Sequence, residues 1–340
     1  MKKLLNTLYI TSELSYLSLD GENIIISNSN QDDFRLPLCN IQEIVCFNYK
    51  GCSPRLMGKC AESNISLVFI SPSGRFLARI VGKIKGNVFT RIAQINCFNN
   101  STQQLVLIRN TLAAKFANTK FLLSRSLRDY QDINCDGKIE KLIIKISDTI
   151  INIYQIEDID ILRGIEGEIA KEYFSVYGRL IRNDEFVFYN RSKHPPLDEI
   201  NAVLSLLYTL QASSITSALE AAGIDPYIGY YHTLRSGRAS LSLDIVEEFR
   251  STVERFVISI FNRNQVNKND FEIKANSAVL LNDEGRHKVI KLWQEKKKEV
   301  ITQSFINQKI QFGLLPFVQA QLLGKYLRKE IEDYPPYVNK

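Results

Sequence analysis

STQQLVLIRNTLAAKFANTKFLLSRSLR, residues 101–128, is the stretch that divides this chain into two kinds of structure. Its apolar side chains recur three or four positions apart, which is the spacing of an amphipathic helix. These side chains are Leu105, Ile108, Leu112 and Phe116. Ser101 offers a side-chain oxygen that can cap the first turn. We therefore predict one long helix that begins near Ser101 and ends near Arg128.

The residues before this helix have the pattern of β-strands. An Asp20-Gly21 pair lies between two β-rich runs and predicts a hairpin. The other elements predicted here are strands at 44–47, 66–70 and 75–81 and a short crossover helix at 54–63. We therefore expect the first part of the chain to be β-rich.

Helical periodicity continues from the long helix to the end of the chain. A break at Asn134–Gly137 precedes a helix that extends to about Ile153. The later helical segments are predicted at 161–180, 197–212, 215–222, 242–262, 286–300 and 314–332. The fold class is therefore α+β, with a β-rich domain at 1–92 followed by a larger helical domain at 93–340.

The composition is that of an ordinary globular protein, with 45% hydrophobic and 24% charged residues among 340. A net charge of +6 permits nucleic-acid binding without requiring it. No apolar run reaches the roughly 18 residues of a membrane span, and the N-terminus lacks the apolar core of a signal peptide. We expect no membrane association and a cytoplasmic location. The six cysteines form no C-x-x-C pair, so we expect reduced, mostly buried thiols.

Four acidic or imidazole side chains are candidates for a divalent-metal site: Glu166, His232, Asp244 and Glu247. On a helix, the three-residue spacing of Asp244 and Glu247 places both carboxylates on one face. One imidazole with carboxylate oxygens is a ligand set typical of Mn²⁺ or Mg²⁺ rather than of a zinc thiolate site. Taken singly, however, the acidic pair also fits an exposed helix face, and His232 fits a structural role.

Glu166 is flanked by Gly164 and Gly167 inside an otherwise helical pattern. Each glycine costs roughly 1 kcal/mol in a helix relative to alanine. Such a pair indicates either close backbone packing or the approach of something large beside Glu166. A simple exposed glutamate is the alternative.

Five basic residues are candidates for contacts with DNA phosphates. Arg235 and Arg238 share the Gly- and Ser-containing loop that follows His232, where arginine can bind phosphate oxygens. The others are Arg191, Lys193 and Arg250. For such residues a solvated surface position is the alternative.

Four sequence motifs, in this order, resemble the CRISPR-associated spacer integrases, the family of the first-numbered Cas protein. They are LRGIEGEIAKEYF (162–174), RSKHPPLDEINAVLSLLYTL (191–210), GIDPYIGYYH (223–232) and SLSLDIVEE (240–248). The N-terminal NTLYITSELSYLSLDGENI resembles the subtype I-C branch of this family.

The resemblance implies a β-sandwich-like N-terminal domain and a helical catalytic domain. It implies metal ligands at Glu166, His232 and Asp244, with Glu247 as a supporting carboxylate, and Mg²⁺ or Mn²⁺ as the cofactor. It implies a homodimer and a small ferredoxin-like adaptation partner, with two integrase dimers around one partner dimer. In subtype I-C, an iron–sulfur adaptation exonuclease often assists.

The implied reaction is the joining of prespacer 3′-OH ends to the CRISPR repeat at the leader by transesterification. Two alternatives remain at this point. One is a general metal-dependent nuclease that acts on branched or single-stranded DNA. The other is a non-enzymatic DNA-binding scaffold in which the acidic cluster is structural.

Overall fold

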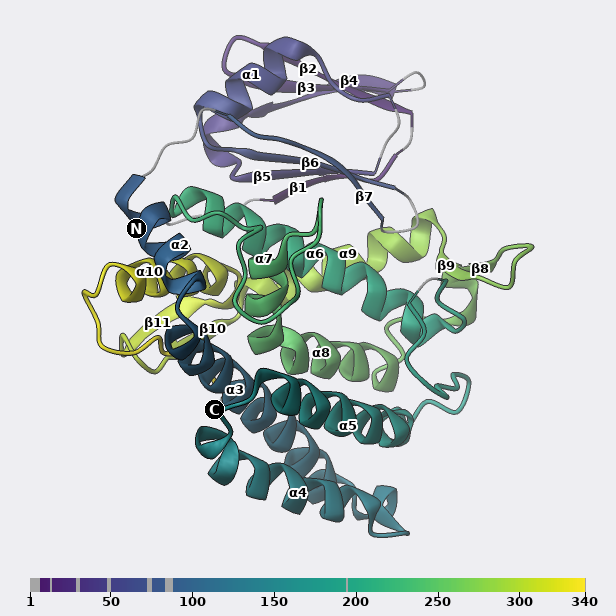
Figure 1. Ribbon diagram of the computed structural model, residues 1–340. Helices are drawn as coiled ribbons and strands as arrows, with labels where there is room; N and C mark the ends of the chain where they lie inside the picture. The colour runs from purple at the N-terminus through teal and green to yellow at the C-terminus, as the bar shows by residue number, and fades with distance from the viewer. Residues whose placement is uncertain are drawn as a thin grey trace.

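The structure is a computed structural model that describes residues 7–12, 14–28, 31–47, 50–71, 75–82, 88–193 and 195–339. A β-rich part stacks on a larger helical part (Figure 1). The strands of the β-rich part are β1 (Thr7–Ile10), β2 (Ser15–Asp20), β3 (Asn23–Asn28), β4 (Gln31–Pro37), β5 (Glu43–Cys46), β6 (Ser66–Ile70) and β7 (Phe76–Ile80).

Two sheets form the β-rich part. One has the order β1-β5-β6-β7, with β1, β5 and β6 parallel and β7 antiparallel. The other is the antiparallel meander β2-β3-β4, and its first turn is the predicted Asp20-Gly21 hairpin. The predicted crossover helix is α1 (Pro54–Glu62), which connects β5 to β6. Ser53 caps α1 by accepting a hydrogen bond from the backbone N–H of Leu56.

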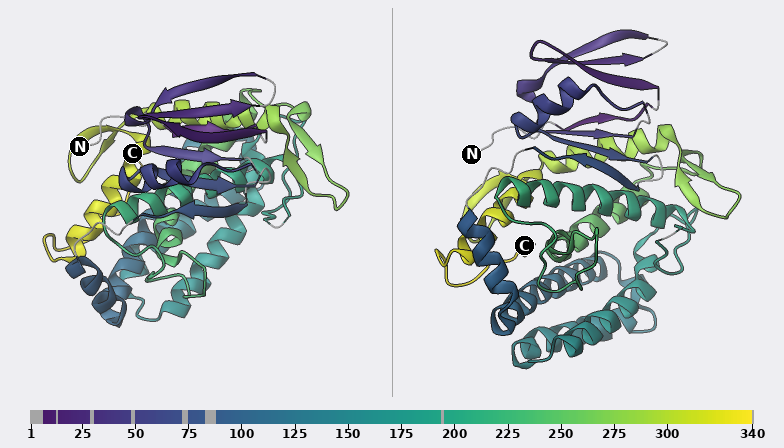
Figure 2. Two further views of the ribbon diagram at one scale, coloured as in Figure 1. Left: turned by 90° about the horizontal axis from the view of Figure 1, so that it is seen from above. Right: turned by 45° about the horizontal axis from the view of Figure 1, so that its top comes forward.

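The four-stranded sheet has two buried faces. Ile44 and Cys46 of β5 pack in the core shared with the three-stranded sheet, whereas Val45 packs in the core of the helical part. This alternation follows the two-residue period of a strand. Figure 2 shows the sheet lying between the meander and the helices. The helical part is therefore built directly on one face of this sheet.

The helical part begins at Val88, after β7 has ended at Ile80. Its helices are α2 (Val88–Phe98), α3 (Ser101–Asp129), α4 (Lys138–Asn152), α5 (Ile159–Tyr177), α6 (Glu199–Ala221), α7 (Ser240–Val246), α8 (Arg250–Asn262), α9 (Asp283–Lys298) and α10 (Leu315–Leu327). The predicted long helix is confirmed as α3, although Asn100 rather than Ser101 caps it. The predicted boundary after residue 92 falls inside α2.

Three details of the helical part differ from the sequence prediction. The segments predicted at 197–212 and 215–222 form one helix, α6. Two small hairpins, β8–β9 (Phe271–Ile273 and Val279–Leu281) and β10–β11 (Val300–Gln303 and Gln308–Gln311), interrupt the helices, so this part is mostly rather than entirely helical. The segment predicted at 242–262 is broken by a 3₁₀ turn at Glu247–Phe249.

Helix α6 is long and apolar enough to cross a membrane by length and composition alone. In the fold it is a core helix, because 61% of its most apolar window is buried. Burial on several sides requires apolar residues all round, and that composition imitates a membrane span.

Candidate metal centre

Three of the four predicted site residues come together around one cavity. Glu166 lies on α5, His232 lies in the loop between α6 and α7, and Glu247 lies in the 3₁₀ turn between α7 and α8. All three line a cavity of about 300 Å³.

Asp244 is fully buried, and its two carboxylate oxygens already have four donors. One oxygen accepts hydrogen bonds from the backbone N–H groups of Tyr230 and Tyr231, at 2.7 and 3.1 Å. The other pairs with the backbone N–H of His232 at 2.8 Å and with its ring Nδ1 at 2.7 Å. Gly229 permits this close approach, because a Cβ there would stand 2.6 Å from Asp244.

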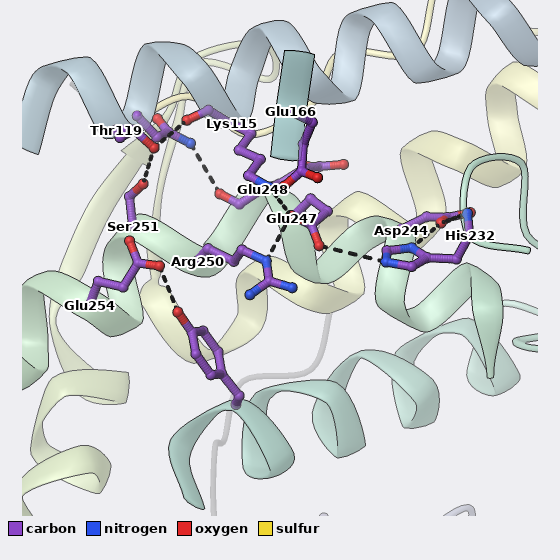
Figure 3. A network of polar contacts seen from close by, with 12 residues as sticks. Lys115, Thr119, Glu166, His232, Asp244, Glu247, Glu248, Arg250, Ser251 and Glu254 are labelled. Carbon is purple, nitrogen blue, oxygen red and sulfur yellow. Dashed lines mark hydrogen bonds and ion pairs between the residues drawn. The ribbon is translucent and has the colours of Figure 1, made fainter. Parts of the chain in front are cut away.

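These contacts make Asp244 an internal acceptor that shapes the His232 loop. Both oxygens already have donors within the protein, whereas the sequence predicted a direct metal contact for Asp244. In the neutral imidazole, this contact places the proton on Nδ1 and leaves the lone pair of Nε2 free. Nε2 lies 3.9 Å from a carboxylate oxygen of Glu247 (Figure 3).

Glu247 is only 3% exposed, yet two cations keep it charged. Its Oε2 accepts from Arg250 Nε at 2.7 Å and lies 2.7 Å from Lys115 Nζ. Burial by itself would raise the pKa of Glu247, but Arg250 and Lys115 more than offset that effect and hold the pKa well below its usual range. Glu247 is therefore an anion with an oxygen turned toward His232.

Lys115 of α3 is the member of this site that the sequence prediction missed. Its ammonium pairs with Glu166 as well as with Glu247. A signal for it was present, because Lys115 follows Leu112 by three residues and Ile108 by seven and so shares the apolar face of α3. A lysine on a core-facing stripe requires a buried partner.

The donor set fits a hard or borderline divalent cation. It offers two carboxylates and one imidazole nitrogen, the ligand types that bind Mn²⁺ and Mg²⁺. Among the described residues, no three such side chains stand at the mutual spacing of metal ligands, and Lys115 lies between the two carboxylates. The chemistry of the site therefore suits a metal, while its geometry is that of a carboxylate–lysine cluster.

Two further residues hold the His232 loop in place. Gln94 of α2 is 4% exposed and donates to the backbone carbonyls of Asp225 and Ile228, at 2.8 and 2.9 Å. Arg163 of α5 donates to the carbonyl of Tyr231 at 2.8 Å. The loop that carries His232 is thus fastened from both α2 and α5.

The predicted DNA-contact residues divide into two groups. Arg235 is exposed, Arg238 is half-buried, and Lys193 is exposed and lines the cavity. Arg191, in contrast, donates to Asn201 at 2.7 Å and packs over the Tyr208 ring, and Arg250 pairs with Glu247. The structure favours internal roles for these last two arginines, which differs from the DNA contacts predicted for them.

The packing around Gly164 and Gly167 bears on one of the explanations considered for these glycines. A Cβ at either glycine would meet no atom within 4 Å among the described residues. Close backbone packing therefore does not explain these glycines. They leave open space beside Glu166, which agrees with the approach of a large ligand.

Comparison with known proteins gives one consistent family. A sequence profile described as "CRISPR associated protein Cas1" matches residues 8–295. A "CRISPR-associated endonuclease Cas1 1" from Chlorobaculum tepidum is 41% identical over 99% of both chains. A "CRISPR-associated endonuclease Cas1 2" from Rhodospirillum rubrum is 40% identical, also over 99% of both chains.

Solved structures share the fold at low sequence identity. A chain of "Casposase bound to integration product" superposes with a TM-score of 0.85 at 20% identity, covering 99% of this chain and 95% of that one. A Cas1 protein from Thermotoga maritima gives a TM-score of 0.80 at 20% identity, over 98% and 100%. A chain of the "Cas6-RT-Cas1--Cas2 complex" gives 0.83 at 19% identity, over 100% of this chain and 37% of that one.

Proposed function

This chain belongs to the Cas1 family of CRISPR-associated proteins, and on that premise we propose that it is a metal-dependent DNA integrase and endonuclease of CRISPR spacer acquisition. One observation carries the proposal. Glu166, His232 and Glu247 come from three separate segments and line one cavity in a chain with these relatives. Such a donor set suits the chemistry of phosphate esters.

We assign Glu166, His232 Nε2 and Glu247 as the residues that hold Mg²⁺ or Mn²⁺. A bound ion would polarise the phosphodiester and stabilise charge on the attacking and leaving oxygens. Asp244 orients His232 from behind, which is the usual role of a carboxylate on the far nitrogen of a metal-binding imidazole. This division reverses the roles that the sequence suggested for the two acidic residues.

The proposed reaction is a transesterification between two DNA strands. The 3′-hydroxyl oxygen of a prespacer attacks a phosphorus at the leader–repeat junction. A bond forms between the prespacer 3′ oxygen and phosphorus while the bond from phosphorus to the leader 3′ oxygen breaks. The attacking hydroxyl gives up its proton, and the departing 3′ oxygen takes one up. Arg235, Arg238 and Lys193 are the proposed phosphate contacts, since none of them has an ion pair with an acidic side chain among the described residues.

The proposed assembly follows the family resemblance. It is a homodimer, and two such dimers flank a dimer of a small ferredoxin-like partner. The "Cas6-RT-Cas1--Cas2 complex" supports such a partner by its composition. We further propose the subtype I-C branch, assistance from an iron–sulfur adaptation exonuclease, and a cytoplasmic location.

The test is a strand-transfer assay with and without Mn²⁺. A labelled prespacer is mixed with a plasmid that carries the repeat, and joined product is measured. Glu166→Ala and His232→Ala should each abolish joining while near-UV circular dichroism shows an intact fold. Glu168→Ala is the matched control, because Glu168 lies two residues along the same helix and pairs with Lys145 at the surface.

Three outcomes distinguish the competing functions. Joined product at the repeat end that depends on Mn²⁺ supports the integrase. Cleavage without preference for the repeat would indicate a general nuclease. DNA binding without joining or metal dependence, or full joining by folded Glu166→Ala, would overturn the metal-site assignment.

A further inference from the structure

Lys115 occupies a point that the proposed metal ligands share. Its Nζ pairs with Oε1 of Glu166 and lies 2.7 Å from Oε2 of Glu247. The side chain is only 10% exposed, although a lysine head normally stays in water. Figure 3 shows the ammonium reaching from α3 into the space between the two carboxylates.

The ammonium of Lys115 reduces the repulsion between the two carboxylates of this site. Two carboxylates held near each other in a mostly buried place repel unless a cation lies between them. Lys115 and Arg250 supply two positive charges against the two negative charges of Glu166 and Glu247. The charge of Asp244 is taken up separately by its four donors. The carboxylate pair is thus neutralised by the protein itself.

A divalent ion would meet this arrangement as a competitor. It would need the Glu166 and Glu247 oxygens that Lys115 contacts, at oxygen distances of about 2.0–2.2 Å. An ammonium and a divalent cation at the same point would repel strongly in a low-dielectric site. The flexible four-carbon stem of lysine lets the ammonium leave while α3 stays in place. The adjoining cavity of about 300 Å³ is lined by Lys115 and gives it room.

We propose that Lys115 is a displaceable internal counter-ion of the metal centre. In the metal-free protein its ammonium holds Glu166 and Glu247 around one point, and a divalent ion binds only when the ammonium moves out. Lys115 is thus a positioning residue. It lowers the affinity for the metal ion by the free energy needed to move its ammonium away from the two carboxylates. The inference rests on the assignment of Glu166 and Glu247 as ligands in the proposed function.

The first test measures Mn²⁺ affinity without DNA, by titration calorimetry or by electron paramagnetic resonance of free Mn²⁺. Lys115→Met keeps an unbranched side chain of similar length and removes the charge. It should bind Mn²⁺ about tenfold more tightly or better than the wild type, because no ammonium has to be displaced. Its metal-free melting temperature should fall, and Mn²⁺ should raise it by more than in the wild type.

The chain offers a matched control. Lys145 of α4 also bridges two carboxylates, those of Glu168 and Glu172 at 2.6 Å each, but its side chain is 32% exposed against 10% for Lys115. Lys145→Met should leave the Mn²⁺ affinity unchanged. An unchanged affinity in Lys115→Met would overturn the inference, and so would loss of Mn²⁺ binding by a folded Lys115→Met protein. Absence of Mn²⁺ binding by the wild type would instead overturn the proposed metal site.

A second measurement uses the wild type alone and so does not depend on how the variant folds. Lysines are acetylated briefly with acetic anhydride, and the extent at each position is read by mass spectrometry. Saturating Mn²⁺ should increase acetylation of Lys115 several-fold and leave Lys145 unchanged. Equal acetylation of Lys115 with and without Mn²⁺, under conditions in which Mn²⁺ binds, would overturn the displacement.

Discussion

Two clusters of this protein contain the same kind of ion pairs but differ in burial and in the segments that supply their glutamates. In both, one lysine ammonium bridges two glutamates, and α5 supplies a glutamate to each: Glu166 to Lys115 and Glu168 to Lys145. In the first cluster the Lys115 side chain is 10% exposed, and its second glutamate comes from the turn after α7. In the second, the glutamates are 61% and 43% exposed and share one helix.

Burial separates the Lys115 cluster from the Lys145 cluster. Exposed ion pairs contribute little to stability, and many fall between about 0 and 1 kcal/mol. The Lys145 bridge therefore needs no further explanation than a solvated helix face. In the Lys115 cluster, charged side chains from segments far apart in the sequence lie together in a buried position next to the imidazole of His232. Burial, the distance in sequence between its members and the neighbouring imidazole single out this cluster as the candidate site, whereas the salt bridge alone does not.

The largest difference between the two clusters should appear when one carboxylate charge is removed from each in turn. Glu247→Gln should lower the rate of strand transfer by about a thousandfold, because it removes an anionic ligand and keeps a side chain that can bond to Arg250. Glu172→Gln, the exposed counterpart, should stay within about twofold of the wild type. Initial rates of joined product at saturating Mn²⁺ measure both.

This pair of variants also separates the two acidic residues after His232. If Glu247→Gln kept wild-type activity, Glu247 would not be a metal ligand. The direct contact would then return to Asp244, and the buried cluster would be structural, as the exposed one is.

A second comparison concerns stability in metal-free buffer. Asp244→Ala leaves four donors without their acceptor in a fully buried place and should lower the unfolding free energy by about 4 kcal/mol. Asp132→Ala removes an exposed acid paired with Arg182 at 3.0 Å and should change it by less than about 1 kcal/mol. Urea denaturation measures both. A loss below about 1 kcal/mol for Asp244→Ala would contradict its role as an internal acceptor.

The sequence predicted those parts of the fold that local chemistry controls. The Asp20-Gly21 turn requires a positive φ, which Gly21 adopts at +58°, so the hairpin was readable. The spacing of its apolar residues predicted the long helix α3. That helix also marked where the strands of the chain give way to helices. The family motifs predicted that Glu166, His232 and Glu247 lie together, and all three line one cavity.

What the sequence did not predict depends on contacts between distant segments. No glycine or proline marks the 3₁₀ turn at Glu247–Phe249. It is held instead from outside, because Asn118 of α3 donates to the carbonyl of Glu248 at 3.0 Å. Glu247 lines the cavity, whereas Asp244 is turned to the His232 loop, and their three-residue spacing alone did not distinguish these two positions. The apolar face of α3 pointed to a buried Lys115 but not to its partners, which lie 51 and 132 residues away.

The smallest expected effect concerns Glu248, the neighbour of Glu247, which is buried and has no ion pair with a cation among the described residues. Glu248 accepts hydrogen bonds from Tyr334, from the Tyr337 backbone N–H and from Gln319. Burial outweighs these bonds and raises the pKa of Glu248 from 4.5 to about 7. The folded state therefore holds a proton that the unfolded chain has released between these pH values.

The sign of the resulting pH dependence follows from that proton. Its stabilisation is fully present below about pH 4.5 and is lost as the pH rises through about 7, by at most roughly 3 kcal/mol. Glu248→Gln mimics the protonated carboxyl, so its unfolding free energy should fall less than that of the wild type between pH 5 and 8. Urea denaturation of both proteins across this range gives the difference. If the two profiles were parallel, Glu248 would already be charged in the folded protein. Burial would then not raise the pKa of Glu248 as it is expected to.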